Sequence, residues 1–382
     1  MTPPSPWQQM KTALPWLPSY VWQRFVRRLP KVRPLHIILG VADHFEPVVQ
    51  PRTPRQITDQ SHRNLRLKEW CRAYPRAVDS WRDDDGHPFR HTYFYPAEQY
   101  DEAVIDLLVE HCRAGWGEIE IHLHHGIECA DTKENTTRVL TEFRDALAAR
   151  GCLSRENGVG PPRYAFVHGN WALANSDHGR YCGIDSELQL LAETGCYADF
   201  TLPAPSPAQI SKINSLYECA LPLTQRAAHR RGTDLQSGRP PTIFPLMIQG
   251  PLLVDFGRRK RGWLLPGIEN GELSGVNPPT LRRFGLWKGA AIAVRGCPDW
   301  VFIKLHCHGM APGGESAMFG TSIQRFLMEL VEGPQNGVEH KLHFVTMREM
   351  VNIILAACDQ RKGNPGEYRD YRFQLIHPPK RK

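Results

Sequence analysis

The sequence predicts an α/β fold in which a parallel sheet or barrel is built from strands and helices that alternate along the chain. Short apolar runs of strand length alternate with longer segments whose apolar residues recur at helical spacing, as in folds made of successive β–α units. The chain of 382 residues is 41% hydrophobic and 23% charged, which is the balance of a globular protein. Collagen-like, fully disordered and small disulfide-stabilised chains are therefore excluded.

The predicted strands are short and are bounded by turn-forming residues. Residues 36–42 form an apolar run typical of a buried strand, and Pro96 ends the run at 90–95. In residues 118–124, isoleucine and leucine alternate with glutamate and histidine, as expected when one face of a strand is apolar and the other polar. Further strands are predicted at 163–168, 198–202, 243–254 and 300–305.

Helices are predicted between most of these strands. Val104, Leu107 and Leu108 recur at helical spacing, and Gly115 is a suitable residue to end that helix. The remaining helices are predicted at 62–74, 135–150, 187–193, 321–332 and 347–358.

One domain is predicted to cover residues 35–360. We do not divide it, because histidine-rich segments lie on both sides of its longest irregular stretch. Two long inserts are expected in this domain, near 48–88 and near 203–242. A basic and aromatic segment, 1–34, precedes the domain, and a basic tail, 361–382, follows it.

The charge distribution and the cysteines indicate which partners and which cellular compartment to expect. The net charge of +7 is concentrated partly at the two ends, and no zinc-finger spacing or RNP-type motif accompanies it, so no nucleic-acid partner is expected. Ten dispersed cysteines without a C-x-x-C pair indicate reduced thiols and a cytoplasmic protein.

The first 34 residues mix tryptophan and phenylalanine with arginine. This composition allows a peripheral membrane contact, although we favour a surface helix packed on its own domain. Neither a signal peptide nor a transmembrane segment is predicted from the sequence.

The 17 histidines are unevenly placed. Several follow predicted strands, where the active site of a (β/α) fold is built from the ends of several different strands. The segments concerned are Asp43-His44, His122-Leu-His124-His125, His168-Gly-Asn170-Trp171 and His306-Cys-His308.

These residues have the chemistry of a metal site. His122 and His124 share one face of a strand, so both imidazoles can point at one ion. His125 begins the following loop and could replace either of them, and Asp43 or His44 would complete a set of three ligands with one open position. The sequence therefore predicts a divalent metal ion, with Zn²⁺ as the first candidate.

In order along the chain, these segments resemble the polysaccharide deacetylase superfamily (NodB homology, carbohydrate esterase family 4). The Asp-Asp pair that ends a strand in that family is similar to Asp43-His44, and its Glu-Ile-x-x-His strand is similar to residues 118–125. Its later Leu-x-x-His motif is similar to residues 305–308. The resemblance covers roughly residues 36–310 and implies a distorted (β/α)7-type barrel with long inserted loops.

The resemblance implies a metal-dependent hydrolase that removes acetyl groups from a carbohydrate or polysaccharide. Asp43 stands where the family has its general base, and His308 where it has its general acid. Asp199 is the candidate for the acidic residue that tunes this acid. The implied metal ligands are drawn from Asp43, His44, His122, His124 and His125.

The sequence also departs from the family pattern. His44 replaces the second aspartate, and the residue four positions after His122 is a glycine where the family usually has a second metal histidine. The Arg-x-Pro-Tyr motif of the family is absent, and His168-Gly-Asn-Trp occupies its place. Aromatic faces suit pyranose rings. The candidate substrate-binding residues are His168, Asn170, Trp171 and His306.

Two other functions remain open from the sequence. A glycoside hydrolase on a related barrel needs two carboxylates that flank a cleft, and Glu46 and Asp199 are candidates for them. A catalytically inactive barrel that binds a glycan or a partner would retain binding without a metal. P-loop, dinucleotide and serine-hydrolase motifs are absent from the sequence.

Overall fold

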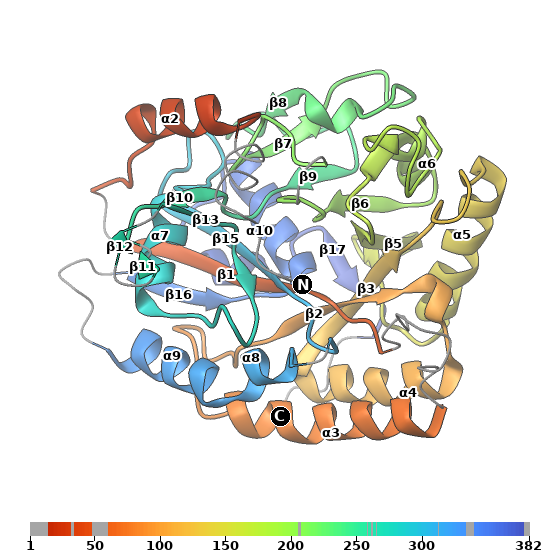
Figure 1. Ribbon diagram of the computed structural model, residues 1–382, viewed down its shortest axis with the longest axis horizontal. Coiled ribbons are helices and arrows are strands. Elements are labelled where there is room, and N and C mark those ends of the chain that lie inside the picture. Colours follow the sequence, from red (N-terminus) through yellow and green to blue (C-terminus); the bar gives the residue numbers. More distant parts are fainter. Residues whose placement is uncertain are drawn as a thin grey trace.

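The computed structural model describes residues 14–31, 34–47, 60–204, 208–257, 259–260, 263–264, 266–311, 313–333 and 340–377. Strands and helices alternate through these ranges, so the predicted α/β class is confirmed (Figure 1). The main sheet is curled, and ten of its strands follow one hydrogen-bonded path. In order across the sheet these are β14 (Glu272–Leu273), β15 (Trp300–Cys307), β1 (Leu35–His44), β2 (His91–Pro96), β3 (Gly117–Leu123), β5 (Val159–His168), β6 (Cys196–Asp199), β9 (Leu246–Ile248), β7 (Leu216–Cys219) and β8 (Gly232–Asp234).

The path is parallel from β14 to β9 and antiparallel at its far end, where β7 pairs with both β9 and β8. β7 and β8 lie within the insert near 203–242, so this insert adds two strands to the sheet and is not wholly irregular. Across the described residues no pairing joins β8 to β14. The sheet is therefore an open half-barrel, and the closed (β/α)7 barrel that the resemblance implies is not confirmed.

Shorter strands lie off this path. β16 (His340–Phe344) pairs with the first half of β1, and β4 (Ser154–Glu156) joins β5 to β17 (Phe373–Leu375). Two small hairpins stand apart from the main sheet; they pair β10 (Leu253–Asp255) with β13 (Gly267–Glu269) and β11 (Arg259–Lys260) with β12 (Trp263–Leu264).

Both faces of the parallel strands are covered, which explains why β1 is a nearly continuous apolar run. Ile37 and Leu39 face one core together with the outer helices, and Ile38 and Ala42 face a second core together with α10 (Met347–Cys358). Figure 1 shows α3, α4, α8 and α9 along the lower side of the sheet, with α5 and α6 to the right. These helices are α3 (Gln60–Val78), α4 (Glu102–His111), α5 (Lys133–Ala149), α6 (Glu187–Glu193), α8 (Glu315–Phe319) and α9 (Thr321–Glu332).

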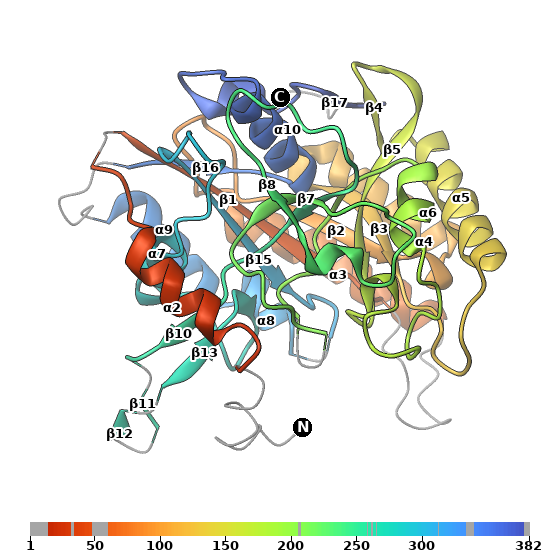
Figure 2. The same ribbon diagram turned by 90° about the horizontal axis from the view of Figure 1, so that it is seen from above.

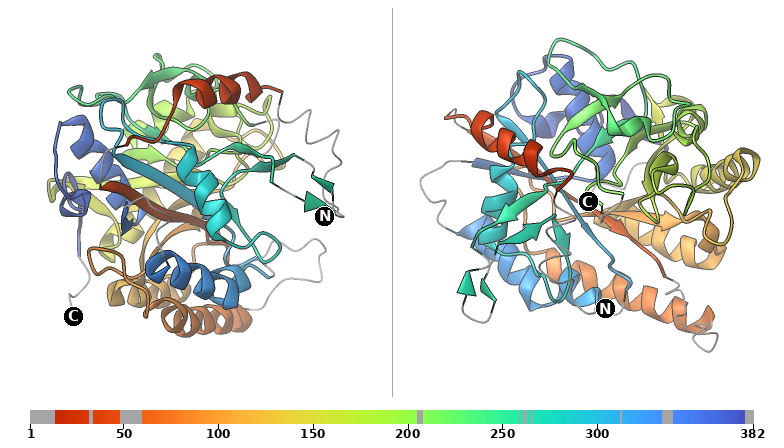
Figure 3. Two further views of the ribbon diagram at one scale, coloured as in Figure 1. Left: turned by 90° about the vertical axis from the view of Figure 1, so that its left-hand side faces the viewer. Right: turned by 45° about the horizontal axis from the view of Figure 1, so that its top comes forward.

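The parallel arrangement brings the carboxyl ends of the central strands to one edge of the sheet. Ala42 of β1 lies beside His306 of β15, and Pro96 of β2 lies beside His122 of β3. Figure 2 shows α10 and β17 at one side of the molecule and the β10–β13 hairpin at the opposite side. In Figure 3, α7 (Leu281–Gly289) lies beside β15.

Helix α2 (Leu17–Val26) is docked on the domain, as the favoured interpretation of the N-terminal segment expected. Trp16 and Tyr20 are buried in the core that contains α10, whereas Trp22 and Phe25 are 67% and 74% exposed. Residues 1–13, 32 and 33 of the predicted segment lie outside the described residues. Within the described ranges, no helix combines the length and the apolar character that a membrane crossing requires.

Residues 361–377 are packed against the domain and do not form a free basic tail. Phe373 is fully buried, and Arg369 forms ion pairs with Asp83, Asp85 and Glu349. The last residues, 378–382, lie outside the described residues. Paired carboxylates explain why this arginine is buried despite the basic composition of the segment.

Replacement of Glu349 by glutamine is expected to lower the free energy of unfolding by about 3–5 kcal/mol, because it leaves buried arginines without their charged partner. Arg90 donates to both carboxylate oxygens of Glu349 at 2.8 and 2.7 Å. Burial raises the pKa of Glu349, but the nearby Arg90 and Arg369 outweigh it and lower the pKa from 4.5 to about 2. The folded carboxyl thus has the lower pKa, so its contribution is present above pH 4.5 and declines as the pH falls towards 2.

Urea denaturation at several pH values measures this effect. The control is Glu329→Gln, which removes an exposed pair with Arg325 and should cost about 0.5 kcal/mol or less. Equal losses in the two variants would contradict the prediction.

Candidate active site

Three side chains from two strand ends offer metal-ligating atoms to one point at the carboxyl edge of the sheet. His44 ends β1, Glu46 follows it by two residues, and His122 lies near the end of β3. One ligand atom from each of these residues lies within 4.8 Å of the other two. The Nε2 atom of His122 is 3.5 Å from Oε1 of Glu46, and the rings of His44 and His122 are 4.9 Å apart.

The hydrogen bonds around these residues leave two buried nitrogens free. His122 donates through Nδ1 to the carbonyl oxygen of Val167 at 2.9 Å, so its Nε2 carries a lone pair. Among the described residues, neither His122 Nε2 nor His44 Nδ1 has a hydrogen-bond partner, although both are buried. Leaving a polar atom buried and unpaired costs about 1–3 kcal/mol, and a bound ion would satisfy both nitrogens.

Electrostatics place these groups in the forms that bind metals. Burial, followed by the nearby His308 and His122, holds the pKa of His44 well below its ordinary value, and burial also lowers the pKa of His122. Burial alone would raise the pKa of Glu46, but the nearby imidazoles of His122 and His124 outweigh this effect and lower it. The site thus contains neutral imidazoles beside a carboxylate.

His124 lies next to this centre, as expected for a residue on the same strand face as His122. The two rings are 4.6 Å apart, and His124 Nε2 is 3.6 Å from Oε1 of Glu46. His124 donates through Nδ1 to Oε1 of Glu98 at 2.6 Å. Burial would lower the pKa of His124, but this bond to Glu98 raises it overall. His124 also borders a cavity of about 600 Å³ that is lined by Glu98, Asp131 and Arg138.

The rim of the centre contains His306 and His308, at the end of β15, and Trp171, which follows β5. The ring of His308 is 4.6 Å from that of His44, and His306 is 6.4 Å from His44. Trp171 is 6.2 Å from His44 and 6.3 Å from His308. Trp171 has a φ of 60°, in the left-handed region. Such backbone strain clusters at functional sites.

Asp43 lies on the opposite face of β1 from His44, because successive residues of a strand point to opposite sides. Its Oδ1 accepts a hydrogen bond of 2.7 Å from the amide of Gly309, and its Oδ2 lies 3.4 Å from Nδ1 of His91. The structure therefore separates Asp43 from the ligand set in which the sequence analysis placed it. It brings Asp43 instead to the turn that immediately follows His308.

Asp199 lies deeper in the sheet than the rim residues. It accepts hydrogen bonds from the backbone and hydroxyl of Thr201 at 3.0 and 2.8 Å. Burial raises the pKa of Asp199 to about 7 and lowers the pKa of Lys304 to about 7. No contact between Asp199 and His308 is found in the described residues, so any tuning of His308 by Asp199 would have to act at a distance.

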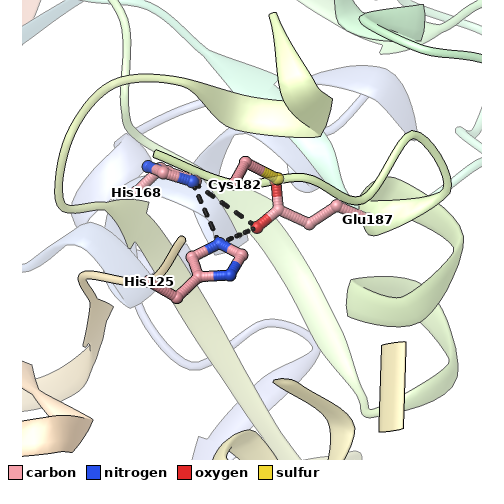
Figure 4. Close-up of side chains that lie close together, drawn as sticks. All are labelled: His125, His168, Cys182 and Glu187. Atoms are coloured by element: carbon pink, nitrogen blue, oxygen red, sulfur yellow. Dashed lines mark hydrogen bonds and ion pairs between the residues drawn. The ribbon is translucent and has the colours of Figure 1, made fainter. Parts of the chain in front are cut away.

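His125 and His168 likewise lie outside the site in which the sequence placed them. Their Nε2 atoms lie 3.1 Å apart in a separate buried cluster with Cys182 and Glu187 (Figure 4). Asn170 lies two residues after His168, and its backbone N–H donates a hydrogen bond to Nδ1 of His168 at 3.3 Å.

Glu46 and Glu98 contact the candidate centre although the sequence analysis did not assign them to it. Glu46 had a usable signal, because it lies two residues after His44 and thus on the same side of an extended chain. Glu98 reaches His124 from the short helix η1 (Ala97–Gln99) that follows β2. That contact depends on the pairing of β2 with β3, which the sequence alone does not give.

Comparison with known proteins gives no match: no family model, no curated protein and no solved structure matches this chain.

Proposed function

We propose that the chain is a metal-dependent hydrolase whose catalytic ion is bound by His44, Glu46 and His122. The observation that carries this proposal is the pair of buried nitrogens, His44 Nδ1 and His122 Nε2, which lack a partner in the described part of the chain and lie beside the Glu46 carboxylate. Two histidines and one carboxylate, with a further position open, are the ligand pattern of catalytic zinc sites. Imidazole nitrogen favours Zn²⁺ over Mg²⁺ or Ca²⁺.

An ion held by these residues would supply Lewis-acid chemistry: it would lower the pKa of water and polarise a carbonyl group. The chain's own residues supply the remaining functions. His308, beside His44, is suited to protonate the leaving group. Asp43 holds the turn after His308 through the amide of Gly309, so we assign it a positioning role. His124 is oriented by Glu98, in the way that carboxylates orient histidines around metal sites.

We propose an acetylated carbohydrate as the substrate. This part of the proposal is supported by the resemblance of the sequence segments and by Trp171, whose ring lies at the rim beside His44 and His308 and offers a stacking surface for a sugar. The glycoside hydrolase alternative has less support, because Asp199, one of its two candidate carboxylates, is fully buried and bonded to Thr201.

Removal of metal is expected to abolish acetate release from N-acetylated or O-acetylated oligosaccharides, and added Zn²⁺ is expected to restore it. The reason is that His44, Glu46 and His122 alone supply no substitute for the Lewis acid. Acetate release is measured before chelation, after chelation and after zinc addition. Full activity in the chelated protein would contradict the proposal. Oligosaccharide binding without acetate release from any zinc-loaded sample would favour the inactive glycan-binding barrel.

A further inference from the structure

A second cluster of ligand-type side chains lies apart from the candidate active site. It contains His125, which follows β3, His168, which ends β5, Cys182 from the following loop, and Glu187, the first residue of α6. One ligand atom from each lies within 4.8 Å of the other three. Figure 4 shows both imidazoles and the carboxylate directed towards one another.

The spacing within this cluster is close to that of the ligands around a single tetrahedral ion. His125 Nε2 is 2.9 Å from Oε1 of Glu187 and 3.1 Å from Nε2 of His168, and the third side of this triangle is 3.7 Å. Cys182 Sγ is 3.5 Å from Oε2 of Glu187. Ligands bound at zinc distances in a tetrahedron are about 3.3–3.8 Å apart, so an ion would move His125 a few tenths of an ångström away from Glu187 and His168.

The surroundings hold these side chains in place. Asp131 lies 3.1 Å from Nδ1 of His125 and accepts a hydrogen bond from it, which leaves His125 Nε2 as the ligating nitrogen. The hydroxyl of Thr136 fixes Asp131 at 2.6 Å, and the amide of Ala174 binds the second oxygen of Glu187 at 2.6 Å. All four members of the cluster are buried. A carboxylate oriented behind a histidine in this way is typical of metal sites.

We propose that His125, His168, Cys182 and Glu187 bind a structural Zn²⁺ ion. Four protein ligands that include a thiolate, with no position left open, are the pattern of structural zinc sites, whereas the candidate active site offers three ligands and an opening. The thiolate and imidazoles select a zinc-like ion over Mg²⁺ or Ca²⁺. This second site does not depend on the hydrolase proposal.

One hydrogen bond in the structure opposes metal binding through His168 and must break when an ion binds. The backbone N–H of Asn170 donates to Nδ1 of His168 at 3.3 Å. In the absence of an ion, the proton of His168 is therefore on Nε2. Binding through Nε2 moves this proton to Nδ1, and the long contact to the Asn170 amide opens. The Cys182 thiol, which donates towards Oε2 of Glu187, must also release its proton to solvent in order to bind as a thiolate.

The ion would hold a loop whose backbone conformation is unusual. Between His168 and Glu187, five non-glycine residues have a positive φ, which L-residues rarely adopt; they are Trp171, Ala174, Asn175, His178 and Tyr181. Backbone strain of this kind persists only where the surrounding structure imposes it. One ion bound to all four members of the cluster would fix both ends of this loop. Because Trp171 lies within the loop, its position at the rim of the candidate active site would be fixed as well.

Cobalt substitution tests the site through its thiolate. Protein loaded with Co²⁺ is expected to show a sulfur-to-cobalt charge-transfer band in the near ultraviolet. Cys182→Ser should lose this band, while Cys129→Ser, a change at an exposed cysteine of the neighbouring loop, should keep it. The His44→Ala/His122→Ala variant should also keep it, so failure of the hydrolase proposal and failure of this one are distinguishable.

Three results would overturn the second site: no charge-transfer band in the Co²⁺-loaded protein, a band that survives Cys182→Ser, or a band that disappears in Cys307→Ser instead. Cys307 is the alternative thiolate, because it lies with Asp43 and His91 in another buried group of ligand-type side chains. The first would favour a metal-free cluster in which a protonated His125 is paired with Asp131 and Glu187. Since Cys182→Ser could fail to fold, trypsin cleavage after the exposed Arg180 provides a second measurement in the His44→Ala/His122→Ala background. Chelation is expected to accelerate this cleavage about tenfold or more, and an unchanged rate would also overturn the proposal.

Discussion

The His44→Ala/His122→Ala variant is expected to contain one equivalent of zinc less than the wild-type protein and to lose hydrolase activity by about 1,000-fold or more. Two of the three proposed ligands are removed, and several kcal/mol of transition-state stabilisation by the ion is lost with them. Its fold should persist, because the one hydrogen bond that the structure shows for these two side chains in the described residues is that from His122 to the Val167 carbonyl.

Metal content per chain and the rate of acetate release are measured together on the same samples. His36→Ala is the matched control, because His36 is a buried histidine at the opposite end of β1 and should keep both properties. Wild-type metal content and activity in the double variant would exclude His44 and His122 as ligands. Equal metal loss in the control would show that the effect comes from general destabilisation.

Strand periodicity accounts for most of what the sequence could predict about the site. The alternation in residues 118–124 correctly placed His122 and His124 on one face, and their rings are 4.6 Å apart. The same rule, applied to the neighbours Asp43 and His44, predicts that they diverge, and the structure shows that they do. The resemblance to an Asp-Asp motif obscured this, because it treats two adjacent residues as one functional unit.

Contacts that depend on loops could not be read from the sequence in the same way. Cys182 meets His125 and His168 only because the intervening chain turns through several left-handed residues. Glycines explain part of this geometry: a side chain on Gly126 would collide with the backbone of Cys182, with its Cβ only 2.4 Å from the carbonyl oxygen. No periodic pattern encodes such a close approach.

The burial of the basic segment near the end of the chain depends on tertiary contacts in the same way. Composition describes residues 361–377 as charged, and charge usually indicates solvent exposure. Arg369 is nevertheless buried, because Asp83, Asp85 and Glu349 converge on it from two other segments. Only the tertiary structure supplies those partners.

Replacement of His308 by alanine is expected to lower kcat by about 10²- to 10⁴-fold, the usual contribution of a general acid, while zinc content stays at the wild-type value. His308 lies beside the proposed ligand His44 but is not a member of its ligand group. Its loss should therefore affect proton transfer to the leaving group and leave metal binding unchanged. Imidazole added to the solution should restore part of the activity of His308→Ala, a rescue that a purely structural role would not allow.

The comparison of Asp43→Asn with His308→Ala separates two roles for Asp43. If Asp43 only holds the turn after His308, asparagine retains an oxygen that can accept the 2.7 Å hydrogen bond from Gly309, and kcat should fall less than about tenfold. If Asp43 is the general base that the resemblance implies, asparagine cannot take up a proton, and the loss should be as large as that in His308→Ala. The burial of Asp43 on the face of β1 opposite to His44 favours the first result, and a loss of 10²-fold or more in Asp43→Asn would restore the catalytic role.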